Sequence, residues 1–217
     1  MLMAEPTPQA AGITLQGDYL DLISLHETIH ELVKNGPDAE EENNAILGLA
    51  YDVRKAYEKQ REEVRIGPDE WETTYQCVNI LWPVVILQTN ALRHLAAYQP
   101  TSREQQANLY RLESCLEKSL METEPVIGKK CTDLLFGPGW LTSGYYTLFL
   151  NELADEYISG PETGIERFRK LPEILEKANP FSKAYRNFAS GLEEQAKQLG
   201  CHPGELSDFS EGVDFQW

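Results

Sequence analysis

Five residues near the start of the chain, His26-Glu27-Thr28-Ile29-His30, have the spacing of a zinc-peptidase helix. Two histidines four residues apart lie on one face of an α-helix, so both imidazoles can reach a single Zn²⁺. The glutamate beside the first histidine can then take a proton from the metal-bound water. A chance match to this motif is expected in roughly one of a hundred chains of this length and composition. The motif therefore predicts a metallopeptidase in which His26 and His30 bind zinc and Glu27 is the general base.

The surrounding sequence argues against this chemistry. Glu31 follows the second histidine, where zincin helices have an uncharged residue, and Val33 stands where the longer metzincin motif has glycine. A third ligand is not evident, although Glu152, in the pattern Asn151-Glu152-x-x-Asp155, resembles the second helix of glutamate zincins. About 25 residues precede the motif, which is short for the substrate-binding sheet of such enzymes.

A structural role explains the same two histidines. On a helical wheel His26 and His30 lie at the edge of the apolar face, between Leu22 and Ile29 on one side and Ile23 on the other. Histidines at such an edge are commonly satisfied by packing and hydrogen bonds alone. The enzymatic and the structural interpretations both stay open.

The helix that positions the motif is predicted over residues 18–34, with Asp18 as its N-cap and Asn35-Gly36-Pro37 as its end. Residues 12–17 alternate apolar and polar side chains, as do two segments on either side of a turn at residues 67–69, so these are predicted strands. The two segments span residues 64–66 and 73–80. Further helices are predicted over residues 43–63, 84–98, 102–122, 125–136, 143–158, 164–178 (with a break near Pro172) and 181–199.

These elements predict a predominantly α protein of the α+β class, a multi-helix bundle with a small antiparallel sheet or hairpin in its N-terminal half. One globular domain is expected over residues 12–202, between a flexible leader at residues 1–11 and an acidic, aromatic tail at residues 203–217. The segment around Trp82 is apolar on nearly every helical face, so we expect it at the centre of the core. The side chains expected to be buried there are Leu81, Trp82, Val85, Ile86, Leu92 and Leu95.

The chain is strongly acidic, with a net charge of −16 from 35 acidic and 19 basic residues spread along its whole length. Such a field repels phosphate backbones and anionic lipids, which argues against direct binding to nucleic acid or membrane. It attracts basic proteins. The charge therefore favours a basic protein partner.

The sequence also indicates a soluble, cytoplasmic protein. The longest apolar run, residues 80–87, is far shorter than the roughly 18 residues of a membrane-spanning helix. The first residues have neither the positive charge nor the apolar stretch of a signal peptide. Cys77, Cys115, Cys131 and Cys201 are widely scattered, as free thiols in a reducing compartment commonly are.

Three short motifs together resemble an uncharacterised bacterial family of unknown function over residues 12–98. They are Gly17-Asp18-Tyr19, Tyr51-Asp52-Val53-Arg54 and Asn79-Ile80-Leu81-Trp82-Pro83. The resemblance implies a compact helical domain in a bacterial or phage setting. It implies no catalytic residues.

The leading functional hypothesis is a non-enzymatic interaction module, an immunity-like or antitoxin-like inhibitor of a basic toxin or nuclease, with no cofactor. Aromatic side chains among carboxylates are expected to contact the partner. These are Trp71, Tyr75, Phe209, Asp214, Phe215 and Trp217. The alternatives are an acidic mimic of DNA and a zinc metallopeptidase with His26, His30 and Glu152 as ligands. The sequence leaves the oligomeric state open.

Overall fold

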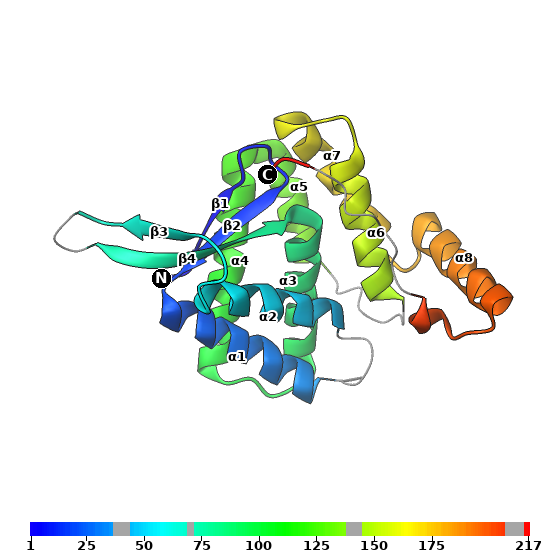
Figure 1. Ribbon diagram of the computed structural model, residues 1–217, viewed down its shortest axis with the longest axis horizontal. Helices are drawn as coiled ribbons and strands as arrows, with labels where there is room; N and C mark the ends of the chain where they lie inside the picture. The colour runs from blue at the N-terminus through cyan, green and yellow to red at the C-terminus, as the bar shows by residue number, and fades with distance from the viewer. Residues whose placement is uncertain (37–43, 69–71, 138–144, 207–214) are drawn as a thin grey trace.

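The N-terminal half of the protein contains a four-stranded antiparallel sheet, as the computed structural model shows (Figure 1). The structure describes residues 1–36, 44–68, 72–137, 145–206 and 215–217. The strands are β1 (Met3–Pro6), β2 (Gly12–Gly17), β3 (Glu63–Ile66) and β4 (Thr73–Leu81), in the spatial order β1-β2-β4-β3. Two hairpins, β1–β2 and β3–β4, thus meet along the β2–β4 pair, which leaves β1 and β3 at the edges.

Helices make up most of the rest. They are α1 (Tyr19–Asn35), α2 (Asn44–Tyr57), α3 (Trp82–Ala97), α4 (Arg103–Thr123), α5 (Pro125–Leu135), α6 (Tyr146–Ser159), α7 (Gly164–Lys177) and α8 (Lys183–Leu199). In Figure 1, α4 passes behind the sheet, α1 and α2 pack side by side at its lower end, and α6 to α8 lie beyond α3. The prediction of a mainly helical α+β fold with a small antiparallel sheet is confirmed.

The core lies between one face of the sheet and the helices around α3. Ile13 and Leu15 of β2 pair with Ile80 and Val78 of β4, so all four side chains point to that face and are buried. Trp82 is 0% exposed at the start of α3. Pro83 suits the first turn of this helix, where its missing N–H has no intrahelical partner. Val85, Ile86, Leu92 and Leu95 are buried as predicted, whereas Leu81 is half-buried.

The other face of the sheet carries polar side chains. Thr14 pairs with Asn79, and the Thr14 hydroxyl donates a 2.7 Å hydrogen bond to the Asn79 side-chain oxygen. Because side chains alternate along a strand, Tyr75 and Cys77 project from this same face. We call this surface the Thr14–Asn79 face.

β2 and β4 approach closely at Gly12, where an added Cβ would lie 1.9 Å from the Ile80 carbonyl oxygen.

The structure corrects three expectations. Residues 1–11 are no flexible leader: they contain β1 and a tight turn, with Leu2 and Ala4 buried. α2 ends at Tyr57 rather than near residue 63, because Lys59 adopts a left-handed φ of 59°. α7 continues through Pro172, since the neighbouring Leu171 and Leu175 are both buried and their packing outweighs the lost hydrogen bond.

Two further expectations concerned membrane-spanning helices and the cysteines. No helix within the described ranges is long and apolar enough to cross a membrane. All four cysteines are free, with Cys77 and Cys131 buried and Cys115 and Cys201 half-buried.

Candidate functional site

The histidine motif lies on α1, which begins at a capping box. The Asp18 carboxylate accepts a 2.9 Å hydrogen bond from the Asp21 N–H, and the Asp21 carboxylate accepts one from the Asp18 N–H. One turn further on, the rings of His26 and His30 contact each other edge to face, with centroids 4.5 Å apart. His26 also packs on Tyr57 of α2, at 5.5 Å. The two imidazoles therefore belong to an aromatic contact between α1 and α2.

The remaining predicted zinc-site residues do not join this pair. Glu27 is exposed, and Glu152 is exposed on α6, a helix that packs on α3 and α7. Within the described ranges, no three His, Cys, Asp or Glu side chains gather closely enough to hold a metal ion. Burial lowers the pKa of His26, and the neighbouring His30 and Arg54 lower it further. The geometry thus gives the histidines a packing role and shows no third ligand for zinc.

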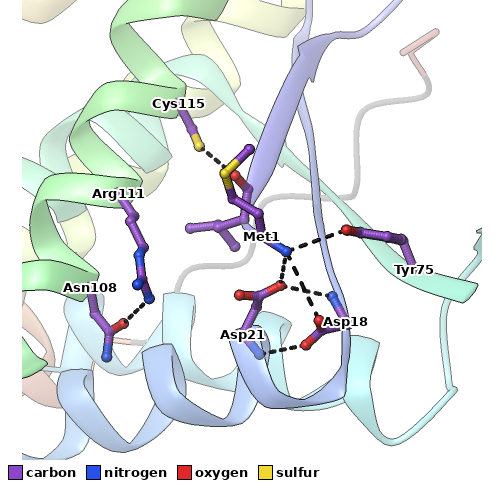
Figure 2. A network of polar contacts seen from close by, with 8 residues as sticks. Met1, Asp18, Asp21, Tyr75, Asn108, Arg111 and Cys115 are labelled. Carbon is purple, nitrogen blue, oxygen red and sulfur yellow. Dashed lines mark hydrogen bonds and ion pairs between the residues drawn. The ribbon is translucent and has the colours of Figure 1, made fainter. Parts of the chain in front are cut away.

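Tyr75 lies on β4 and takes part in a polar network at the start of the chain (Figure 2). Its hydroxyl accepts a 3.3 Å hydrogen bond from the Met1 amino group, which also contacts the Asp21 carboxylate at 2.6 Å. Beside this network, residues of β1 and α4 line a cavity of about 500 Å³. The Cys115 thiol of α4 donates to the Leu2 carbonyl at 3.1 Å, and burial raises the pKa of this thiol, which keeps the proton in place. These contacts hold β1 against α4.

The last three residues, part of the predicted tail, dock onto the domain. The Trp217 carbonyl accepts a 2.9 Å hydrogen bond from the Gln9 N–H, and the rings of Phe215 and Trp217 contact edge to face with centroids 5.0 Å apart. Arg167 of α7 is 4% exposed, and its guanidinium donates to the carbonyls of Gln216 (3.2 Å), Gln9 (3.4 Å) and Glu162 (3.2 Å). One buried cation therefore joins the chain end, the β1–β2 turn and the start of α7.

Of the other predicted contact residues, Trp71, Phe209 and Asp214 lie outside the described residues.

Trp217 forms part of a cavity of about 460 Å³ on the Thr14–Asn79 face, which we call the Trp217 cavity. Its lining residues are Asp52 of α2, Arg61 and Glu62 before β3, Cys77, Val78 and Asn79 of β4, and Trp217. Of the predicted contact residues, Trp217 lines this cavity, and Tyr75 lies on the same face of the sheet outside the lining.

Two carboxylates, Asp52 and Glu62, line this cavity and are incompletely neutralised by Arg61, the one cation among the described lining residues. Asp52 contacts Arg61 at 3.8 Å, whereas Glu62 and Glu5 make no ion pair with any residue that the structure describes. Burial raises the pKa of Asp52, and the nearby Arg61 opposes that rise only in part. Burial also raises the pKa of Cys77, and the charges of Glu62 and Glu5 raise it further, which places both carboxylates near the thiol. The cavity combines an aromatic wall with an excess of negative charge, an arrangement suited to a cation.

Sequence reasoning did not single out Asp52, Asn79 or Arg167 as functional. A signal existed for the first two, since each belongs to one of the motifs that resemble the uncharacterised family, and the structure brings both motifs to one cavity. Arg167 left no such signal, because its three acceptors are backbone carbonyls and two of them, on Gln9 and Gln216, are distant in the sequence.

The chain belongs to the family described as a domain of unknown function, DUF6904, which it matches over residues 2–217. No curated protein and no solved structure matches it.

Proposed function

We propose that this protein is a non-enzymatic interaction module that binds and inhibits a basic protein, in the manner of an immunity protein or antitoxin. The observation that supports the proposal is the Trp217 cavity, in which an indole lies among carboxylates that lack full compensation. A lysine or arginine side chain of the partner would enter this cavity. Unpaired cysteines are consistent with the cytoplasmic setting that such a role requires.

The recognition chemistry follows from the lining residues. A guanidinium or ammonium over an indole gains roughly 0.5–2 kcal/mol, the more so when water is excluded. The same cation would pair with Glu62, which is exposed, and with Asp52, whose carboxyl is partly buried. Because burial penalises the charge of Asp52, an entering cation relieves that penalty and lowers the pKa of this carboxyl. Binding near the raised pKa of Asp52 is therefore expected to release a proton.

The net charge of −16 supports the proposal at longer range. Complementary fields accelerate the encounter of a basic partner, and this acceleration falls with increasing salt. No observation on the described residues gives comparable support to the zinc peptidase or to the DNA mimic.

The experiment isolates the partner and then tests its chemistry. The protein is immobilised, bound proteins are recovered from cells that produce it natively, and the recovered partner is purified and assayed with and without the protein. We expect a basic partner whose activity falls at a stoichiometric ratio. Glu62→Lys should abolish this inhibition, whereas Glu152→Lys, the same reversal on an exposed site of α6, should not.

Three results would contradict the proposal. They are an acidic partner, a basic partner that keeps its activity, and equal effects of the two charge reversals. Displacement of the protein by a DNA oligonucleotide, with Glu62→Lys as effective as the native chain, would favour the DNA mimic instead.

A further inference from the structure

The β3–β4 hairpin projects from the helical body, and β3 forms its free edge (Figure 1). All four β3 residues, Glu63–Ile66, are exposed. In contrast, the other edge strand, β1, is covered by α4: Cys115 donates to the carbonyl of Leu2, just before β1, and Ser119 donates to the carbonyl of Ala4 within it. Of the two edges of the sheet, the β3 edge is the open one.

The hydrogen-bond register identifies which backbone groups of β3 face outward. The Cys77 N–H donates to the Glu62 carbonyl at 2.9 Å, and Val64 pairs with Tyr75 two residues further along the strand. Bonded and non-bonded pairs alternate in an antiparallel ladder. The N–H and C=O groups of Glu63 and Arg65 therefore point away from β4, toward the free edge. No described residue lies on that side to bond them.

The side chains of β3 extend the Trp217 cavity into a longer surface. Val64 lies opposite Tyr75, so it projects from the Thr14–Asn79 face, and so does Ile66, two residues on. Val64 is 37% exposed and Ile66 is 36% exposed. An apolar strip on β3 is thus continuous with the cavity that contains Glu62.

Charge selects between the possible occupants of this edge. Residues 62–72 include five carboxylates and a single basic residue, Arg65. Among the described residues, Arg65 contacts the Glu72 carboxylate at 3.4 Å, and Lys59, just before the hairpin, contacts the Glu63 carboxylate at 3.7 Å. A second copy of the hairpin would bring like charges together, which disfavours self-pairing. A strand with lysine or arginine at alternate positions meets the opposite charge and satisfies the same backbone groups.

We propose that the outer edge of β3 binds an extended basic segment of the partner by strand addition, which makes that segment a fifth strand of the sheet. Backbone hydrogen bonds to Glu63 and Arg65 hold the segment. Its apolar side chains cover Val64 and Ile66, its basic side chains lie near Glu63 and Glu72, and its end beyond Glu62 reaches the Trp217 cavity. This inference rests on the proposed function and specifies how the partner binds.

The test removes one outward N–H and keeps the sheet. Arg65→Pro deletes the N–H that faces the free edge, a position where an edge strand tolerates proline. Arg65→Gln removes the same charge but keeps the N–H, and is the matched control. The probe is a short end-blocked peptide of alternating lysine and valine, and its counterpart of alternating glutamate and valine is the negative probe. Binding is measured by titration with NMR detection, together with amide hydrogen exchange.

We expect the lysine–valine peptide to slow exchange at the Glu63 and Arg65 amides. Its affinity should fall at least tenfold in Arg65→Pro and change less than threefold in Arg65→Gln. The glutamate–valine peptide should not bind. Equal binding to Arg65→Pro and to the native chain would overturn the proposal. If Arg65→Pro does not fold, the exchange pattern of the native chain decides, and protection confined to other residues overturns the proposal.

Two outcomes separate this inference from the function on which it rests. If the natural partner still binds Arg65→Pro but not Glu62→Lys, strand addition is wrong and the acidic cavity stands. If the native chain sediments as a dimer that Arg65→Pro dissociates, the occupant of the edge is a second copy and the inference is wrong.

Discussion

Replacing Arg167 with methionine should loosen the C-terminal residues from the domain and thereby disturb the Trp217 cavity. The guanidinium is 4% exposed and donates to three backbone carbonyls, two at 3.2 Å and one at 3.4 Å. A hydrogen bond from a charged donor contributes about 1.5–3 kcal/mol. Counting only the two shorter bonds at the lower value gives about 3 kcal/mol. The third, longer bond adds to this loss and the removed cost of burying a charge subtracts from it, so we expect a loss of about 2–4 kcal/mol.

The loss is measured as the decrease in the free energy of unfolding in urea. The slope of that free energy against urea concentration should stay unchanged. A second measurement reports on the site itself: hydrogen exchange of the Gln9 N–H, which donates to the Trp217 carbonyl, should become faster. The control is Arg186→Met on α8, because Arg186 is exposed and its guanidinium hydrogen-bonds, among the described residues, only to the Ser182 carbonyl, at 3.4 Å. That control should change stability by less than about 0.5 kcal/mol. A stable Arg167→Met variant with slow exchange at Gln9 would refute the assigned role of Arg167.

Three further predictions concern the core, the cavity and the histidines. Trp82→Ala should lower the free energy of unfolding by about 3–5 kcal/mol, because the indole is fully buried against Phe168; a loss below 1 kcal/mol in urea unfolding would contradict this packing. Burial raises the pKa of Asp52 in the folded protein above its pKa in the unfolded chain. The carboxyl therefore lowers the stability of the fold as the pH rises from the unfolded-state pKa through the folded-state pKa. Asp52→Asn should therefore stabilise the protein relative to the native chain at pH 7 but not at pH 3, as paired thermal melts will show, and a gap independent of pH would be contrary to this account. Elemental analysis of the purified protein should find no stoichiometric zinc; about one zinc per chain, lost in His30→Ala, would instead establish the metal site.

The sequence was sufficient for elements whose signals are local. Asp18 marked the start of α1, the turn at residues 67–69 marked the β3–β4 hairpin, and the apolar run around Trp82 marked the central helix. Each signal depends on residues a few positions apart, where capping, turn chemistry and helical periodicity act.

Elements that depend on distant contacts could not be predicted in this way. β1 is stable because it pairs with β2 and because Ser119 of α4 donates to the Ala4 carbonyl at 2.7 Å, a contact across most of the first half of the chain. The end of α2 had no glycine to mark it, since Lys59 adopts the left-handed conformation itself.

Of the residues that line the Trp217 cavity, the sequence singled out Trp217 alone as a partner contact. The carboxylate expected beside it was Asp214, which lies outside the described residues, whereas the structure places Asp52 and Glu62 in the lining. Their meeting depends on Arg167 and Gln9, which hold the chain end in place. These are contacts between segments far apart in the sequence, and composition gives no information about them.

The most direct test of the acidic cavity as a partner-binding site is the affinity of the purified partner for Trp217→Ala. The matched control is Phe181→Ala, which removes an 83% exposed aromatic side chain next to α8, outside the lining of the Trp217 cavity. Isothermal titration at two salt concentrations should show at least a tenfold loss for Trp217→Ala, little change for Phe181→Ala, and weaker binding at higher salt. Equal affinities for the two variants would place the partner elsewhere on the protein and contradict the account.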